Sequence, residues 1–62
     1  MNSAEEKQLF EKYGWLYDYI EREWRAPDGS WITEDQLVKY TDNPEGELQL
    51  QMFILEHGKE NK

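Results

Sequence analysis

The sequence predicts an all-α fold of three helices in a single small domain over residues 1–62. Two observations support this prediction. Apolar side chains recur every three or four positions through residues 3–24, which is the period of an amphipathic helix. Two later segments, 33–41 and 44–57, each begin with residues that commonly cap helices. A chain of 62 residues is long enough for one domain.

The first predicted helix, residues 3–24, is the longest element. Ser3 and Glu6 have the spacing of a capping box at its start. Its apolar stripe consists of Leu9, Tyr13, Leu16, Ile20 and Trp24. Residues 27–29, Pro-Asp-Gly, form a turn signal that ends the helical pattern, because proline disfavours helical geometry in the residue before it.

The second predicted helix, residues 33–41, has the best-defined start. Thr33 and Gln36 have the spacing of a capping box. Ile32 precedes the cap and Leu37 follows it by four positions, which is the arrangement of a hydrophobic staple. These local signals agree, so we expect the helix to begin at Thr33.

The third predicted helix, residues 44–57, follows Asn43 as a cap and has Pro44 in its first turn. Its apolar residues also alternate with glutamines over 48–55, so a strand remains an alternative there. As a helix, the segment is apolar on two opposite sides. One side carries Leu48, Met52 and Leu55, and the other carries Leu50, Phe53 and Ile54. A helix of this kind needs cover on both sides. Two other short elements of the chain could supply it, but a second copy would do so more easily, which predicts a homodimer. Residues 59–62 read as a frayed polar tail.

Stability is a problem for a domain of this size, because a chain of about 60 residues buries only about 60% of its unfolded surface. There is no cysteine, so disulfides are excluded, and there is one histidine. Self-association or dense packing of the nine aromatic residues must therefore stabilise the fold.

An aromatic pair lies on an unexpected side of the first predicted helix. Trp15 and Tyr19 are four residues apart, so they would stack on the face nearly opposite the apolar stripe. Arg22 lies beside them, and Trp, Tyr and Arg are the residues that dominate binding hot spots. The pair therefore predicts a contact with a partner. The alternative is that the 26–32 loop or the C-terminal segment covers Trp15.

The charge predicts the kind of partner. The chain has 14 acidic and 7 basic residues, and most of the excess acid falls in residues 28–56. This balance disfavours nucleic acid and anionic membranes and favours a basic protein surface. We predict the partner-binding residues Trp15, Tyr19, Arg22, Glu34, Asp35, Asp42, Glu45 and Glu47.

No catalytic residue, cofactor site or metal site is predicted. His57 lies at a helix end, where a cation interacts well with the helix dipole. The acidic segment 42–47 lacks the twelve-residue ligand spacing of a calcium loop. No signal peptide and no apolar run of about 20 residues are visible, so we expect a cytoplasmic protein.

Together these observations predict a small acidic, non-catalytic protein-binding module, which inhibits or modulates a basic partner that handles nucleic acid. A sharper version is a mimic of nucleic acid. The alternative is a helix-turn-helix DNA-binding regulator built on 33–41 and 44–57, although Glu45 and Glu47 would repel phosphates at the start of its recognition helix. In length and composition the chain resembles small accessory proteins of bacteria and phages, but no motif supports this likeness.

Overall fold

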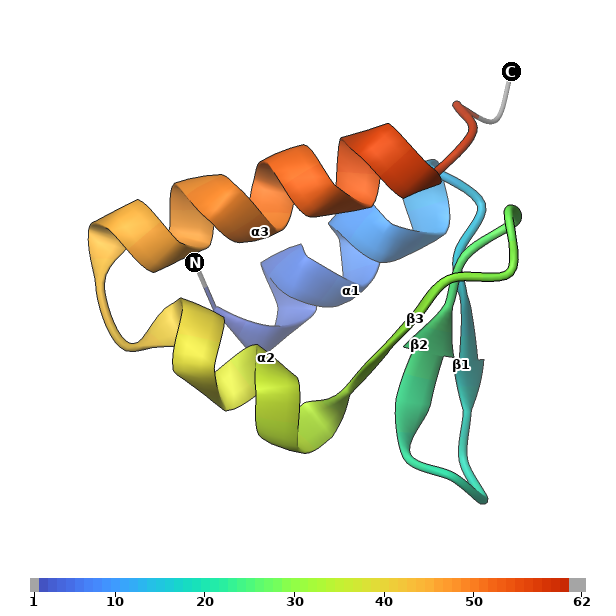
Figure 1. Ribbon diagram of the computed structural model, residues 1–62, viewed down its shortest axis with the longest axis horizontal. Coiled ribbons are helices and arrows are strands. Elements are labelled where there is room, and N and C mark those ends of the chain that lie inside the picture. Colours follow the sequence, from blue (N-terminus) through green and yellow to red (C-terminus); the bar gives the residue numbers. More distant parts are fainter. Residues whose placement is uncertain (1, 61–62) are drawn as a thin grey trace.

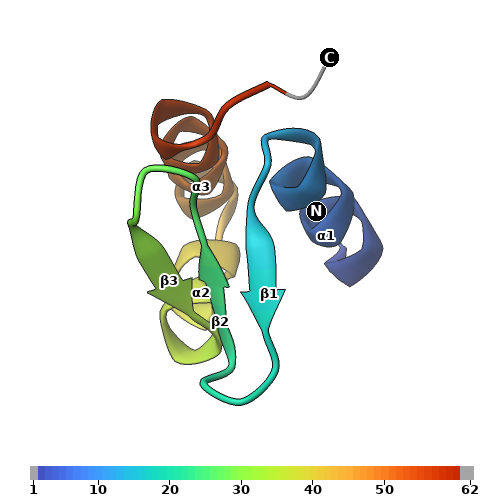
Figure 2. The same ribbon diagram turned by 90° about the vertical axis from the view of Figure 1, so that its right-hand side faces the viewer.

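The computed structural model describes residues 2–60, which form an α+β fold (Figure 1). The elements in chain order are α1 (Ser3–Lys12), β1 (Leu16–Asp18), β2 (Glu23–Arg25), β3 (Trp31–Thr33), α2 (Glu34–Thr41) and α3 (Pro44–His57). The strands form an antiparallel sheet in the order β1-β2-β3. In Figure 2 the sheet lies in front, α2 and α3 lie behind it, and α1 flanks β1. The all-α prediction is therefore wrong.

The predicted helix over 3–24 ends at Lys12, because glycine stops it there. Gly14 adopts a left-handed conformation with φ +79°. Its N–H donates to the carbonyl of Glu11 at 3.1 Å, and the N–H of Trp15 donates to the carbonyl of Phe10 at 2.9 Å. These two bonds form a Schellman motif, in which a contact between the flanking apolar residues is common. Here the rings of Phe10 and Trp15 meet edge to face, with centroids 5.2 Å apart.

The start of α1 also differs from the prediction by one residue. Asn2, not Ser3, is the cap: its side chain accepts the N–H of Glu5 at 2.9 Å. The Asn2 amide also donates to the Glu5 carboxylate at 2.9 Å. Asparagine and serine can both serve as caps. Here Asn2 and Glu5 make the bonds that were predicted for Ser3 and Glu6, one position further along the chain.

After α1 the chain forms a hairpin where the sequence predicted more helix. The carboxylate of Asp18 accepts the N–H groups of Ile20 and Glu21 at 2.9 and 3.0 Å, which caps the loop between β1 and β2. Arg22 then adopts φ +55°, a left-handed position that glycine or asparagine usually fills. The carbonyl of Arg22 accepts the N–H of Glu34 at 3.1 Å, which helps to hold this conformation.

Side chains alternate between the two faces of the sheet, as the pleat requires. One row crosses the inner face and is buried or half-buried: Tyr17, Trp24 and Ile32. The next row crosses the outer face and is exposed: Leu16, Arg25 and Trp31. Aromatic and β-branched residues favour such pleated surfaces. This preference outweighs the helical spacing of the apolar residues, from which a helix was predicted here.

The turn predicted at residues 27–29 is present, but it joins β2 to β3 and does not follow a helix. The carbonyl of Ala26 accepts the N–H of Gly29 at 3.1 Å, and the N–H of Ala26 donates to the carbonyl of Ser30 at 2.7 Å. Gly29 has φ +93°. A three-residue hairpin loop commonly ends on a left-handed residue of this kind.

The two later helices confirm their predicted capping signals. Thr33 accepts the N–H of Gln36 at 3.2 Å, and the Gln36 side chain accepts the N–H of Thr33 at 3.0 Å, which completes the capping box. Asn43 accepts the N–H of Gly46 at 2.8 Å at the start of α3. The segment 44–57 is helical throughout, so the alternative of a strand is wrong.

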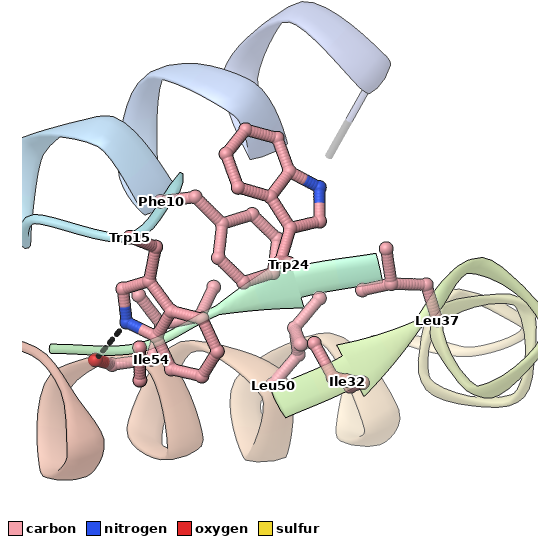
Figure 3. Close-up of a cluster of buried hydrophobic side chains, with 8 residues drawn as sticks. Phe10, Trp15, Trp24, Ile32, Leu37, Leu50 and Ile54 are labelled. Carbon is pink, nitrogen blue, oxygen red and sulfur yellow. Dashed lines mark hydrogen bonds between the residues drawn. The ribbon is translucent and has the colours of Figure 1, made fainter. Parts of the chain in front are cut away.

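The core lies between the inner face of the sheet and the three helices (Figure 3). Its buried members are Phe10, Trp15, Trp24, Ala26, Ile32, Leu37, Leu50 and Ile54. Trp24 stacks on Phe10 with ring centroids 4.5 Å apart and an angle of 5° between the planes. The opposite side of α3 carries Leu48, Met52 and Leu55, which are all exposed, so the described residues do not supply the cover that the sequence predicted for this side.

Gly58 and Lys59, which follow α3, pack against the end of α1. The N–H of Lys59 donates to the carbonyl of Tyr13 at 2.7 Å. A Cβ at Gly58 would lie 2.6 Å from the Cβ of Tyr13, so this approach requires glycine. A frayed tail was predicted over 59–62, but the bond to the Tyr13 carbonyl holds Lys59 in place, and residues 61–62 lie outside the described part of the chain.

The helix stop predicts a difference between two glycines. Gly14 and Gly29 both have positive φ, but a Cβ at Gly14 would also lie 3.3 Å from the Lys59 carbonyl oxygen and from Pro27. Around Gly29 the same Cβ would meet nothing within 4 Å. We expect Gly29→Ala to cost about 1–2 kcal/mol of unfolding free energy from strain alone, and Gly14→Ala to cost more. Urea denaturation measures both, and equal losses would contradict the crowding at Gly14.

Candidate protein-binding groove

Trp15, the leading partner-binding candidate, lies in the core. It is 1% exposed, and its indole N–H donates to the carbonyl of Ile54 at 3.0 Å (Figure 3). Its ring also packs against Phe53, with centroids 5.8 Å apart. This is the alternative that the sequence left open, in which the C-terminal segment covers Trp15. In this structure Trp15 has no surface to offer a partner.

Tyr19 and Arg22 lie in the loop between β1 and β2, whereas Trp15 precedes β1. Tyr19 and Trp15 therefore do not form the stacked pair that the sequence predicted. Tyr19 is 79% exposed. Its ring contacts the ring of Tyr17 edge to face, with ring centroids 4.7 Å apart. Arg22 is also exposed. The loop therefore presents two of the three residue types typical of hot spots, but without the tryptophan.

The predicted acidic residues fall into two groups at opposite ends of α2. Glu34 and Asp35 lie in its first turn, and Asp42, Glu45 and Glu47 lie where α2 meets α3. An eight-residue helix is about 12 Å long, so the two groups do not form one patch.

The two aromatic residues of the predicted pair should respond differently to mutation. Trp15→Ala removes a buried ring and a hydrogen bond, so we expect a loss of about 3–5 kcal/mol in unfolding free energy. Tyr19→Ala removes an exposed ring and should change stability by less than about 1 kcal/mol. Chemical denaturation of both variants measures this. A Trp15→Ala protein as stable as wild type would contradict the core position of Trp15.

An open groove of about 890 Å³ lies between α1 and α2. One face of α1 forms one wall with Ser3, Glu6, Lys7 and Glu11. One face of α2 forms the other wall with Glu34, Leu37, Val38 and Thr41. Between them lie residues 14–17, Tyr19 and Trp24. The sequence alone does not reveal this groove, because it does not fix how the α1 wall and the α2 wall lie relative to one another.

Trp24 contributes an unused hydrogen-bond donor to the groove. The residue is 8% exposed, yet its indole N–H has no acceptor within residues 2–60. Figure 3 shows the nitrogen on the side of the ring that faces away from Trp15, toward the space between α1 and Leu37. No buried side-chain nitrogen or oxygen among the described residues lacks a partner, so this N–H is not buried: it reaches the solvent in the groove and is open to an acceptor on a bound molecule.

The walls of the groove carry more negative than positive charge. Glu6, Glu11 and Glu34 provide three carboxylates, and Lys7 provides one cation. Partial burial raises the pKa of Glu6 above its ordinary value of 4.5, and the nearby carboxylate of Glu47 raises it further. A cation placed beside Glu6 would offset both effects, because it favours the charged carboxylate.

Tyr17 and Glu34 connect β1 to the start of α2 along the groove. The hydroxyl of Tyr17 donates to the Glu34 carboxylate. This hydrogen bond raises the pKa of Tyr17, and desolvation adds to the rise. The contact orients one wall carboxylate and ties the sheet to α2.

Ser30, His57 and Asp28 have the composition of a catalytic triad but not its geometry. Ser30 Oγ lies 3.1 Å and Asp28 Oδ2 lies 2.7 Å from the same ring atom, His57 Nδ1. A triad requires the hydroxyl and the carboxylate on different ring nitrogens. The Ser30 N–H, and then His57, hold the pKa of Asp28 below its ordinary value of 3.8. The cluster therefore anchors the β2–β3 turn to the end of α3.

Two other site classes find no support in the described residues. Over positions 2–60, no group of three or more His, Cys, Asp and Glu side chains is arranged to hold a metal ion. Among the helices of that same region, none has the length and apolar character needed to cross a membrane.

Comparisons of this chain with models of known protein families, with curated proteins and with solved structures found no significant match. The functional assignment therefore rests on the geometry and charge described above.

Proposed function

We propose that this protein is a non-catalytic binding module whose groove between α1 and α2 holds a basic, amphipathic segment of a partner protein. The observation that carries the proposal is the unbonded indole N–H of Trp24 in a groove with carboxylates on both walls. Tyr19 and Glu34, two residues predicted to bind a partner, line this groove. Binding through them would inhibit or modulate the partner.

The composition of the groove favours an amphipathic ligand. Trp24, Leu37 and Val38 supply apolar surface, and Val38 is 59% exposed. Helix-in-groove recognition places apolar anchors against such a surface and leaves charged side chains at the rim. Lys or Arg side chains on the ligand would meet Glu6, Glu11 or Glu34.

The size of the groove favours a short segment over a folded surface. Its volume of about 890 Å³ is near the upper end of ordinary ligand pockets, which measure about 300–1,000 Å³. That space accommodates a few anchoring side chains. The net charge of −7 adds long-range attraction toward a basic partner and raises the rate of encounter.

A partner that handles nucleic acid is the class we favour, because such proteins carry basic surfaces. Nucleic-acid mimicry is the sharper form of this proposal, and DNA binding through α2 and α3 is its rival. Glu45 and Glu47 lie in the first turn of α3, where a recognition helix would approach phosphates, so the charge favours a protein partner. We propose a cytoplasmic location, with which a cysteine-free chain is compatible.

A model peptide tests the groove directly. We expect a synthetic amphipathic helix of leucine and lysine to shift the NMR signal of the Trp24 indole N–H, because that group gains an acceptor or a new neighbour. The Trp15 indole signal should shift less, although Trp15 also borders the groove, since its N–H is already bonded to the Ile54 carbonyl. The chain has three tryptophans and so three indole signals, and substitution of Trp15 and of Trp24 by phenylalanine, one at a time, assigns the two that are compared.

Charge variants supply the matched control. Glu6→Lys combined with Glu11→Lys should weaken peptide binding by at least about tenfold and make it less sensitive to salt. Glu45→Lys combined with Glu56→Lys makes the same change of net charge outside the groove and should weaken binding much less. Equal effects of the two pairs, or a peptide that leaves the Trp24 signal unchanged, would refute the groove as the binding site.

A further inference from the structure

The groove between α1 and α2 combines a hydrogen-bond donor with an excess of carboxylates. The donor is the indole N–H of Trp24, a residue that is 8% exposed and whose N–H has no acceptor in the described part of the chain. The carboxylates are those of Glu6, Glu11 and Glu34. A ligand that satisfies both features needs a hydrogen-bond acceptor with positive charge beside it.

The end of a helix supplies that combination. A carboxylate acceptor on the ligand would be repelled by the three carboxylates of the groove. Carbonyls in the interior of a helix already accept the N–H four residues further along, whereas the last four carbonyls lack this partner. The helix dipole also favours Lys and Arg in the last turn. One or two such residues more than offset the roughly half negative charge of the helix end itself.

The chain already holds the end of its own α3 with the same two kinds of group. The indole N–H of Trp15 donates to the carbonyl of Ile54 in the last turn of α3, at 3.0 Å (Figure 3). The basic residue of that turn is His57, whose Nδ1 lies 2.7 Å from a carboxylate oxygen of Asp28. An indole donor and a carboxylate therefore meet at one helix end. The groove repeats this pair of groups with the N–H of Trp24 open to a ligand.

The size of the groove fits the end of a helix better than a whole helix. One turn rises about 5.4 Å and is about 10 Å across with its side chains, so it occupies about 420 Å³. The groove, at about 890 Å³, holds no more than about two turns. Helices in globular proteins average about three to four turns. The rest of a bound helix would therefore extend out of the groove.

We propose, on the basis of the function proposed above, that the groove binds the C-terminal end of a partner helix with Lys or Arg in its last turn. A carbonyl of that turn accepts the N–H of Trp24. The basic side chains pair with Glu6, Glu11 or Glu34 on the walls. Apolar side chains one turn earlier pack on Val38, which is 59% exposed.

Two synthetic peptides and isothermal titration calorimetry of the full chain test this mode of binding. Both peptides have the same composition of leucine, alanine and lysine, blocked ends, and a central hydrocarbon staple that keeps them helical. One has its lysines in the last turn, and the other has them in the first turn. We expect the last-turn peptide to bind at least about tenfold more tightly, because only this peptide brings lysines and free carbonyls into the groove together.

Tryptophan variants show whether the indole N–H takes part. Trp24→Phe keeps an aromatic ring beside Phe10 but removes the donor, so it should weaken binding of the last-turn peptide by about three- to tenfold. It should leave the affinity of the first-turn peptide unchanged, because that peptide places no free carbonyl beside its lysines. Trp31→Phe, at an exposed position outside the groove, is the matched control and should change neither affinity. Circular dichroism checks the folding of each variant.

The outcomes separate this mode of binding from the proposed function. Equal binding of the two peptides, or tighter binding of the first-turn peptide, would overturn the helix-end mode and leave the groove as the site of a segment that lies along it. Binding of neither peptide to wild type would overturn the proposed function as well. A folded Trp24→Phe protein that binds the last-turn peptide as tightly as wild type would overturn the role of the indole N–H. The peptide comparison needs wild type alone, so it decides the matter even if Trp24→Phe fails to fold.

Discussion

The stop of α1 at Gly14 determines the rest of the structure. The left-handed turn there ends the helix and directs Trp15 under α3, where its indole N–H bonds to the Ile54 carbonyl. The same turn starts the hairpin, whose inner row brings Trp24 against Phe10. The core, the groove and the open sheet face all depend on this change of direction. In a chain this small, dense packing of the aromatic cluster provides the stability that disulfides provide in other small domains.

Local signals in the sequence predicted α2 and α3, because capping bonds join residues three positions apart. Thr33 with Gln36 and Asn43 with Gly46 make the bonds that their types and spacing indicate. The first hairpin was missed because its loop contains neither glycine nor proline and places Arg22 in the left-handed position. The turn at Gly14 was readable in principle, since glycine followed by a large apolar residue is typical of a helix end.

The candidate site was harder to predict than the fold. Its excess of acid was visible in the composition, and Tyr19 and Glu34 were among the predicted partner-binding residues. Glu6, Glu11 and Trp24 were not, because one face of α1 meets one face of α2 only after the hairpin is formed. Trp24 was predicted to be core, which its 8% exposure confirms, but its free N–H depends on which neighbours surround it in space. No pattern along the chain shows that.

The most direct test of this account is the backbone conformation of residues 15–24 in solution, measured by NMR chemical shifts and nuclear Overhauser effects. We expect extended shifts in β1 and β2, with cross-strand effects between Tyr17 and Trp24 and between Leu16 and Arg25. Helical shifts that continue without a break from α1 to Trp24, with sequential amide-to-amide effects, would contradict it. That result would restore the long helix and remove the groove, the core position of Trp15 and the open sheet face together.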